Sequence, residues 1–337
     1  AAIFLLLCTA VFLAGCSSNK AKEDIHSPQT PLIWPSPPEP ARISYYKSIE
    51  TPADIGANKG FFQRIAELLL GPTTDDIIKP YGVTVDSTGR IIVIDTALKR
   101  VHIFDGAKKK YSYIDEAGDA QLQSPIAAAV DGEDNIYVTD SLNPGVYAFS
   151  RRGKFLFEIP GLGRPTGIAV DKKAGRLYVS DTQRHVVEVY DLKGKNIMTI
   201  GGHGEGPGQF NFPVDLFVDV KGDLYVVDTM NFRIQIFGPG GNFQTMFGRH
   251  SDGSGDFGRP KGISVDSEGN IYVADALFDT IQIFDRSGNF LLNFGALGRQ
   301  VGFFWLPSGM FIDETDKIYI ADSYNKRIQI FDYLSQG

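Results

Sequence analysis

The chain has 337 residues and a mass of 37.0 kDa, and 33 Lys and Arg against 40 Asp and Glu give it a net charge of −7. With 43% hydrophobic and 22% charged residues, the composition is that of a globular protein and excludes a disordered or fibrous chain. The negative charge also argues against a dedicated nucleic-acid-binding protein, so no nucleic-acid partner is expected.

The chain begins with an apolar segment that predicts a secretion signal over residues 1–15. Residues 1–14 carry no charge, and the run is too short to cross a bilayer as a helix. It leads into Leu13-Ala14-Gly15-Cys16, which resembles the lipobox of bacterial lipoproteins. In that family the signal is removed before the cysteine, and the thiol carries a lipid. An ordinary signal followed by a chance cysteine is the alternative.

This resemblance implies a lipid-anchored protein of the bacterial cell envelope. In Gram-negative lipoproteins an Asp directly after the cysteine favours the inner membrane, whereas Ser17 follows it here. The resemblance therefore implies the outer membrane, with the domain facing the periplasm or the cell surface. Apart from the lipid on Cys16, no cofactor is predicted. Cys8 lies inside the signal, so the mature domain has no thiol and depends on its core for stability.

Residues 16–41 are interpreted as the lipidated cysteine and a tether, and residues 42–337 as the folded domain. Six prolines between positions 28 and 40 favour extended polyproline geometry, with a rise of about 3.1 Å per residue. The tether would hold the domain away from the membrane surface.

Two elements are predicted between the tether and the rest of the domain. Residues 43–49 alternate polar and apolar side chains in the manner of a strand. Residues 60–70 predict a short helix whose apolar stripe consists of Phe61, Ile65, Leu68 and Leu69. We expect this stripe to pack against the rest of the domain; contact with the membrane or a partner is the alternative.

One motif then recurs six times over about residues 78–332. Each copy opens with a proline and an apolar run that closes on an Asp, and a second Asp follows nine or ten residues later. The opening prolines are Pro80, Pro125, Pro165, Pro213, Pro260 and Pro307. The first Asp series is Asp86, Asp131, Asp171, Asp219, Asp266 and Asp313, and the second is Asp95, Asp140, Asp181, Asp228, Asp275 and Asp322. Self-similarity at a spacing of 40–48 residues is typical of repeat architectures.

Each copy accommodates four short strands joined by tight turns. In the fifth copy these strands are predicted at 262–265, 271–274, 281–284 and 290–294. Four-stranded units of this length, repeated radially, make a β-propeller. The predicted fold class is therefore all-β, a six-bladed β-propeller. The sixth copy stops after its third strand, so residues 43–49 are expected to supply the fourth strand and close the ring.

The repeated motif resembles the NHL repeat. The resemblance is carried by Pro-x-Gly-Ile-x-Val-Asp and Ile-Tyr-Val-Ala-Asp within 260–285, and by Asn-x-Arg-Ile-Gln-Ile-Phe-Asp at 325–332. A WD40 propeller is less favoured, because neither Trp34 nor Trp305 precedes an Asp. With its lipobox and tether, the whole chain is similar to bacterial NHL-repeat lipoproteins, a resemblance that implies no single activity.

Side chains that recur from blade to blade are interpreted as structural. The twelve Asp residues are expected to accept backbone hydrogen bonds at turns. Three arginines at equivalent positions are expected to pair with a nearby Asp: Arg100, Arg233 and Arg327. Three phenylalanines that each precede a repeat proline by three residues are assigned to the core: Phe210, Phe257 and Phe304. The glycine-rich segment 201–208 is interpreted as a blade-linking loop, because no helix follows it to complete a phosphate site.

Three histidines are the candidate metal ligands, although no metal is predicted. His185 lies in a loop between a second and a third strand, and His203 and His250 lie in loops that lead to the next blade. In a propeller these loop classes share a face, and three imidazoles can hold zinc with one position open. The NHL resemblance adds weight to this alternative, because the peptide-amidating lyase of that family uses a propeller-bound metal.

Non-repeated side chains predict a binding surface on the loop face of blades four to six. The candidate residues are Met230, Phe232, Arg233, Leu277, Phe278, Tyr324, Arg327, Lys261 and Asp215. The apolar members occupy loops where the repeat has polar residues, which is typical of contact surfaces. We therefore expect a scaffold without catalytic activity that binds an envelope protein or a peptide. A metal-dependent lyase or hydrolase with its site at the channel mouth is the alternative.

We predict that Cys16→Ser releases the protein from the membrane fraction, because the thiol is the acceptor of the lipid. The measurement is fractionation of cells at high salt, followed by immunoblotting, with Cys8→Ser as the matched control. Retention of the Cys16→Ser protein in the membrane pellet would show that the lipoprotein interpretation is wrong.

Overall fold

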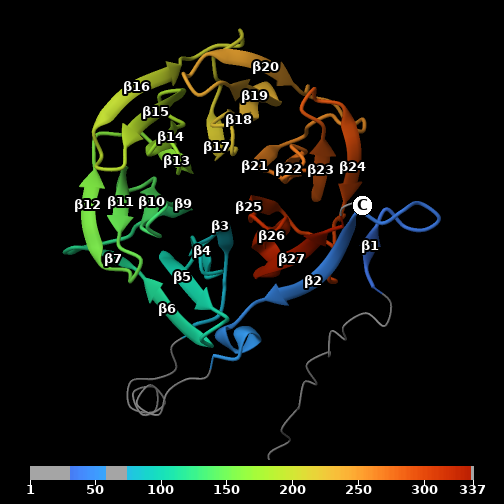
Figure 1. The fold of residues 1–337 in the computed structure, drawn as a ribbon, viewed down its shortest axis with the longest axis horizontal. Coiled ribbons are helices and arrows are strands. Elements are labelled where there is room, and N and C mark those ends of the chain that lie inside the picture. Colours follow the sequence, from blue (N-terminus) through green and yellow to red (C-terminus); the bar gives the residue numbers. More distant parts are fainter. Residues whose placement is uncertain (1–30, 58–73, 335–337) are drawn as a thin grey trace, which may run out of the picture. The chain divides into compact units, whose positions relative to one another are not determined.

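The computed structural model describes residues 31–57 and 74–334. These residues form six antiparallel sheets arranged as blades around a central axis (Figure 1), which confirms the all-β, six-bladed propeller. The predicted signal, Cys16 and the helix predicted at 60–70 lie outside the described residues. Within residues 31–57 and 74–334, no helix has the length and hydrophobicity needed to cross a lipid bilayer.

The first three blades follow one another along the chain. Blade one is β3 (Pro80–Val85), β4 (Ile91–Asp95), β5 (Arg100–Asp105) and β6 (Lys110–Ile114). Blade two is β9 (Pro125–Val130), β10 (Ile136–Asp140), β11 (Gly145–Phe149) and β12 (Phe155–Ile159). Blade three is β13 (Pro165–Asp171), β14 (Arg176–Asp181), β15 (Val186–Asp191) and β16 (Asn196–Gly201). A short hairpin, β7 (Glu116–Ala117) and β8 (Ala120–Gln121), connects blades one and two.

Blades four to six complete the ring. Blade four is β17 (Pro213–Val218), β18 (Leu224–Asp228), β19 (Arg233–Phe237) and β20 (Phe243–Phe247). Blade five is β21 (Pro260–Val265), β22 (Ile271–Asp275), β23 (Thr280–Phe284) and β24 (Phe290–Phe294). Blade six is β25 (Pro307–Ile312), β26 (Lys317–Asp322), β27 (Arg327–Tyr333), β2 (Ile43–Ile49) and β1 (Ile33–Trp34). Single 3₁₀ turns lie at Pro52–Ile55, Thr229–Asn231 and Ser323–Asn325.

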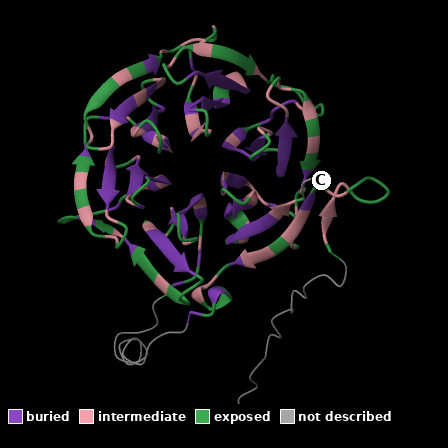
Figure 2. Ribbon diagram, viewed as in Figure 1, coloured by how far each residue is buried: buried purple, intermediate pink, exposed green. Residues whose placement is uncertain are grey.

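The second strand of each blade is apolar without alternation because both of its faces are covered by neighbouring blades. In β4, Ile91 and Val93 belong to the cluster between blades six and one, whereas Ile92 and Ile94 belong to the cluster between blades one and two. Figure 2 shows the same distribution around the ring, with buried inner strands and outer strands that expose part of their length. The core is therefore divided among the blade interfaces.

The phenylalanines that precede the repeat prolines lie in these interfaces, as predicted. Phe210, Phe257 and Phe304 are completely buried, each in a different inter-blade cluster. Each ring packs beside a second phenylalanine; the centroids of Phe210 and Phe237, for example, are 5.6 Å apart. The recurrence of this residue type thus reflects packing rather than ligand binding.

The repeated Asp residues accept backbone hydrogen bonds, which confirms their structural interpretation. In the first series, Asp86 Oδ1 accepts the N–H groups of Thr88 and Arg90, at 2.9 and 3.0 Å, and so closes the hairpin between the first two strands. In the second series, Asp95 Oδ2 accepts the N–H groups of Ile78 and Lys79, which enter the inner strand. The second series therefore attaches each linker to its blade.

The two ends of the blades define two faces of the propeller. We call the face that carries the blade linkers and the turns between second and third strands the linker face. The opposite face carries the two hairpins of each blade, and we call it the hairpin face. Pairing of Pro80 with Asp95, and of Pro260 with Asp275, places the start of the inner strand beside the end of the second strand. Linkers and turns therefore share one face, as predicted.

The ring is closed by the strand that precedes the repeats, as predicted. β2 pairs with β27, with Ile43 opposite Tyr333 and Ile49 opposite Ile328. Ile43 and Ile49 are completely buried. Because β2 comes from one end of the domain and β27 from the other, this pairing ties the two ends of the ring together.

The predicted tether extends too far into the folded domain. Residues Ile33–Trp34 form β1, which pairs with β2 as the outermost strand of blade six. The ring of Trp34 lies 5.7 Å from that of Phe294 and 5.8 Å from that of Phe331. The proline-rich composition hid this strand, because its stability comes from aromatic packing on a distant part of the chain.

We predict that β1 and β2 contribute unequally to closure. Trp34→Ala should lower the free energy of unfolding by about 1–3 kcal/mol, since a partly buried aromatic ring is lost. Deleting residues 31–50 should lower it further, because the edge of β27 is then exposed. Chemical denaturation measures both effects, and Tyr46→Ser, on an exposed position of β2, is the control. Equal stability of the wild type and the deletion variant would contradict the role of β1 and β2 in closing the ring.

Candidate functional site

Exposed apolar side chains are distributed unequally between the two faces. Among the described residues, seven large apolar side chains that are more than a third exposed lie in the loops of the linker face: Leu142, Phe212, Met230, Leu277, Leu297, Phe303 and Tyr324. On the hairpin face the same group contains Val220, which is 91% exposed. Most of the others lie on outermost strands. The linker face therefore has the composition of a contact surface, whereas the hairpin face does not.

Two adjacent aromatic rings on the linker face of blade six each have a cation beside them. The Arg299 guanidinium lies 5.1 Å from the centre of the Trp305 ring, and Trp305 lies 5.4 Å from Tyr324. On the other side of Tyr324, the Lys79 ammonium lies 5.6 Å from the ring. We call these four residues the cation–aromatic ladder. It combines apolar area with positive charge, so it suits a partner that carries acidic and apolar side chains.

Several exposed cations lie on the linker face around the ladder. The exposed cations around it that form no ion pair with a described residue are Lys79, Arg259, Arg299 and Lys326. Arg249 is also exposed, but its guanidinium is paired with Asp256 at 2.7 Å. Lys79, Arg259, Arg299 and Lys326 are therefore available to acidic groups of a partner.

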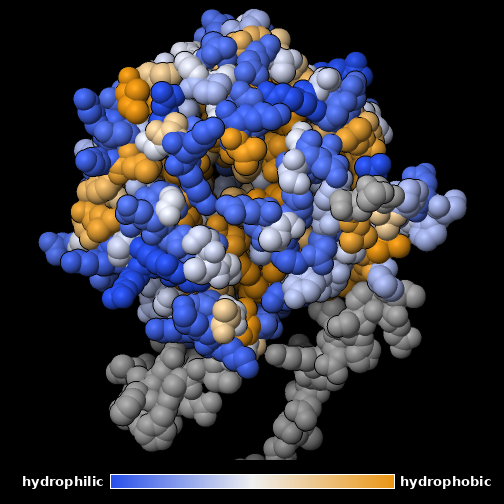
Figure 3. Space-filling model, in the orientation of Figure 1, coloured by the Kyte–Doolittle hydropathy of each residue, from blue (hydrophilic) through white to orange (hydrophobic). Residues whose placement is uncertain are grey.

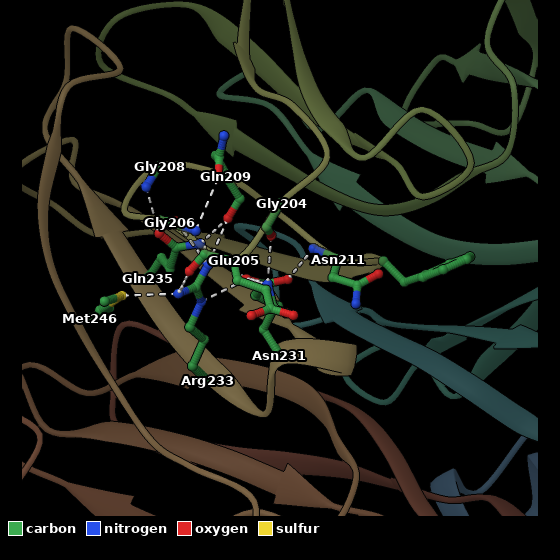
Figure 4. Close-up of polar contacts among 12 residues, drawn as sticks. Gly204, Glu205, Gly206, Gly208, Gln209, Asn211, Asn231, Arg233, Gln235 and Met246 are labelled. Atoms are coloured by element: carbon green, nitrogen blue, oxygen red, sulfur yellow. Dashed lines mark hydrogen bonds and ion pairs between the residues drawn. The ribbon is translucent and has the colours of Figure 1, made fainter.

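The structure removes two predicted arginines from the candidate surface, because both are buried. Arg233 Nε donates to Asp228 at 2.8 Å, and its terminal nitrogens donate to the carbonyl oxygens of Glu205, Gly206 and Gln209 (Figure 4). Arg327 repeats this arrangement with Asp322, Gln300 and Phe303. The predicted Asp pairing is confirmed for both. These guanidinium groups hold the long linkers in place and are not available to a partner.

Arg100 differs from its two equivalents. Its guanidinium lies over the ring of Tyr113, 4.0 Å from the centroid, and donates to the carbonyl oxygen of Thr74. Asp95, the equivalent of Asp228 and Asp322, has His102 Nε2 at 3.6 Å, within the blade. Arg100 therefore does not repeat the arrangement of Arg233 and Arg327, because a histidine takes the place of the arginine beside the carboxylate.

The predicted apolar contacts divide into exposed and packed residues. Met230, Leu277 and Tyr324 are exposed by 52%, 59% and 47%. Phe232 is half-buried against blade five, where its ring lies 4.2 Å from that of His250. Phe278 is also half-buried, and its ring lies close to Gly258. The first three residues are thus more accessible to a partner than the two phenylalanines.

The three candidate histidines do not come together. His185 and His203 have ring centroids 4.4 Å apart, whereas His250 packs against Phe232 at a tilt of 39°. Burial lowers the pKa of His185, and the nearby His203 contributes to the shift. His185 Nδ1 also accepts the N–H of Phe212 at 3.1 Å, so that nitrogen is already used. No group of three or more His, Cys, Asp or Glu in the described part of the chain is placed to hold a metal ion.

The inner strands enclose a channel with a cavity of about 850 Å³. Hydrophobic side chains are visible in the central opening, inside a rim of hydrophilic ones (Figure 3). Lys261 and Asp215, two of the predicted binding residues, line the linker-face end of this cavity, and Tyr81 joins them from blade one. The Lys261 ammonium lies 4.8 Å from the centre of the Tyr81 ring. Three polar groups from three blades therefore converge at one end of the channel.

Burial changes the proton affinity of these three groups. It raises the pKa of Asp215 to about 7, although the N–H groups of Leu216 and Ile263 bond to the carboxylate. It lowers the pKa of Lys261 to about 8, with further lowering by Arg259 and Lys79. It also raises the pKa of Tyr81. Water in the channel reaches parts of these side chains, but the surrounding protein still penalises charge.

Several residues of the linker face and the channel were missed in the sequence. Tyr81 stands in the second position of an inner strand, where pairing between β3 and β4 shifts in register. Such a bulge turns a side chain away from the regular alternation and into the channel. Trp305 and Phe303 follow a glycine-rich linker whose path is set by Arg327. The position of Tyr81 differs in every copy of the repeat, so comparison of the copies does not single it out; both Tyr81 and the ladder required the tertiary structure.

The comparisons with known proteins support the same architecture. A family model described as a 6-bladed beta-propeller matches residues 164–234, and the NHL repeat model matches residues 304–331. No curated protein matches the chain. Together with the strand order of the six blades, these matches show a six-bladed β-propeller with an NHL repeat at residues 304–331.

Solved structures with a similar fold belong to proteins of different kinds. Virginiamycin B lyase from Staphylococcus aureus with quinupristin is 12% identical, over 78% of this chain and 97% of that chain, with a TM-score of 0.59. An auxiliary nutrient binding protein from Bacteroides thetaiotaomicron is 16% identical, over 78% and 71%, with a TM-score of 0.61. A chain of a nidogen/laminin complex is 20% identical, over 73% and 88%, with a TM-score of 0.56. At these identities the likeness shows the fold alone.

We predict that Arg327→Ala destabilises the domain, whereas Arg299→Ala does not. Loss of the Arg327 guanidinium leaves Asp322 buried without its charge partner, which should cost about 3–5 kcal/mol. Arg299 is exposed, so its loss should change the free energy of unfolding by less than about 1 kcal/mol. Denaturant titration of both variants measures the difference. Equal stabilities would show that the guanidinium of Arg327 does not hold the linker.

Proposed function

We propose that this protein is a lipid-anchored propeller of the bacterial cell envelope that binds a protein or peptide partner on its linker face. The observation that carries the binding proposal is the concentration of exposed apolar side chains in the loops of that face, among them Met230, Leu277 and Tyr324. Apolar side chains of this size are costly to expose, and contiguous groups of them mark contact surfaces. The Leu13-Ala14-Gly15-Cys16 motif supports the anchor and the envelope location.

The chemistry of the linker face favours a partner segment with acidic and apolar side chains. Lys79, Arg259, Arg299 and Lys326 supply positive charge, and Trp305 and Tyr324 supply flat apolar area between the cations. Carboxylates of a partner would pair with the cations at the edge, while apolar side chains cover Leu277 and the ladder. Opposite charges would also speed the encounter and make it sensitive to salt.

A metal-dependent lyase or hydrolase receives less support. The described residues do not fit a three-ligand zinc site, since His250 lies apart from the pair of His185 and His203. The likeness to virginiamycin B lyase is one of fold, at 12% identity. The binding proposal therefore rests on the linker face, and no reaction is assigned to the channel mouth.

We predict that the linker face, and not the hairpin face, contacts the partner. A photoreactive amino acid at position 277 should cross-link one envelope protein in intact cells, which mass spectrometry identifies. Leu277→Ser combined with Tyr324→Ser should then lower the affinity of the purified partner by at least about 2 kcal/mol, because central apolar contacts are lost. High salt should weaken binding to the unmodified protein.

Val220→Ser is the matched control, because Val220 is exposed on the hairpin face. It should leave the affinity unchanged, and all variants should retain the melting temperature of the wild type. Undiminished affinity of the double variant, or an equal loss with Val220→Ser, would contradict the assignment of the linker face.

A further inference from the structure

The linker-face end of the channel contains three polar side chains that form no hydrogen bond or ion pair with another described side chain. Within the described residues, no side chain bonds to the Asp215 carboxyl, which accepts the N–H of Ile263 at 3.2 Å. The Lys261 ammonium forms no ion pair with a described residue and lies over the ring of Tyr81. All three side chains are half-buried at one end of a large cavity, and a few convergent polar groups in such a cavity are typical of a ligand site.

Asp215 differs from the residues at the equivalent position of the other inner strands, which are small. At its position the other five inner strands have Gly or Ala: Gly82, Ala127, Gly167, Gly262 and Gly309. The glycines are required by close approach of neighbouring strands; a Cβ on Gly262 would lie 2.2 Å from the carbonyl oxygen of Ser308. A carboxyl group at this level in one blade alone is not part of the repeated scaffold, in contrast to the twelve structural Asp residues.

The charges around this end of the channel favour an anion. Lys261 faces the cavity, and Arg259 and Lys79 lie close enough to lower its pKa further. Arg164 and Arg259 also act on the phenol of Tyr81. Against these four cations, Asp215 is the acid that raises the pKa of Tyr81. An amine would meet net positive charge here, whereas an anion would find the Lys261 ammonium in a partly desolvated site.

Beyond these polar groups the channel becomes apolar. Phe217 of blade four and Phe311 of blade six line the middle of the cavity, together with small side chains such as Ala129 and Ala169. The volume of about 850 Å³ is in the range of sites for small organic molecules. The site thus offers a charged end and an apolar body to one ligand.

We propose that the channel binds a small organic acid, with its carboxylate on Lys261 and Tyr81 and its apolar body along Phe217 and Phe311. Asp215, when protonated, donates a hydrogen bond to the same carboxylate. A dianionic phosphate is less suitable, because the Asp215 carboxyl, which acts on the phenol of Tyr81, repels a second negative charge at this end of the channel when it is ionised. This site goes beyond the proposed function, since it lies inside the channel and does not depend on the linker-face partner.

The test uses the purified protein and three small carboxylates with apolar parts of increasing size: acetate, hexanoate and phenylbutyrate. Isothermal titration should show saturable binding that strengthens with apolar size, and phenylbutyramide, which lacks the charge, should bind at least tenfold more weakly. Lys261→Met should weaken phenylbutyrate binding at least tenfold. Lys221→Met is the matched control, because Lys221 lines the same cavity at its hairpin-face end.

The pH dependence separates the roles of the two ionisable groups. Between about pH 6 and pH 8 the affinity for phenylbutyrate should fall, because Asp215, with a pKa raised to about 7, ionises and repels the ligand. Lys261, with a pKa lowered to about 8, loses part of its charge in the upper half of this range. Asp215→Asn should remove the lower part of the decrease, while the cations Lys79, Arg164 and Arg259 stay charged.

Several outcomes would overturn the proposal. These are no saturable binding of any of the three acids up to their solubility limits, equal binding of phenylbutyramide, or an equal loss of affinity in Lys261→Met and Lys221→Met. Tighter binding of inorganic phosphate than of phenylbutyrate would assign the site to a different anion. Unchanged melting temperatures confirm that the variants are folded, and Leu277→Ser should leave binding of phenylbutyrate intact.

Discussion

The structure depends on a buried carboxylate that attaches each linker to its blade. At the end of every second strand, an Asp such as Asp95 or Asp275 accepts the N–H groups of the residues that enter the inner strand. The chain there is crossing from the rim of one blade to the axis of the next, where no strand pairing satisfies its backbone. A carboxylate with several acceptor sites meets this need inside the protein. Without it, the linkers would have no defined path into the channel.

Because every linker is attached in this way, the linkers and turns of the linker face can differ in length and in residue type from blade to blade. The Asp alone holds a short linker in place. Where they are long, Arg233 or Arg327 and a neighbouring glutamine add further hydrogen bonds to linker carbonyl oxygens. Rigid long linkers can then hold Leu297 and Phe303 in solvent, at the edge of the cation–aromatic ladder. The same scaffold leaves the start of the inner strands able to carry Tyr81, Asp215 and Lys261 into the channel.

The architecture could be predicted from local patterns, whereas parts of the candidate surface could not. Apolar runs between turn residues indicate strands, and six copies with an incomplete last copy indicate a closed ring. Arg327 was assigned to the surface because its residue type and loop position match a binding residue. In the structure it turns inward, because its guanidinium donates to Asp322 and to the carbonyl oxygens of Gln300 and Phe303 in the linker that follows blade five. Such contacts have no signature in the spacing of residues.

The sequence by itself determined the repeat, the four strands of each blade, the structural role of the Asp series and the closing strand at 43–49. All of these follow from short-range periodicity and from residue types that recur in register. The tertiary structure decided that Ile33–Trp34 belongs to blade six, that the two arginines are buried, and that Lys261 meets Tyr81 across the channel. The physical reason is distance along the chain: these contacts join residues from different blades, and only closure of the ring brings them together.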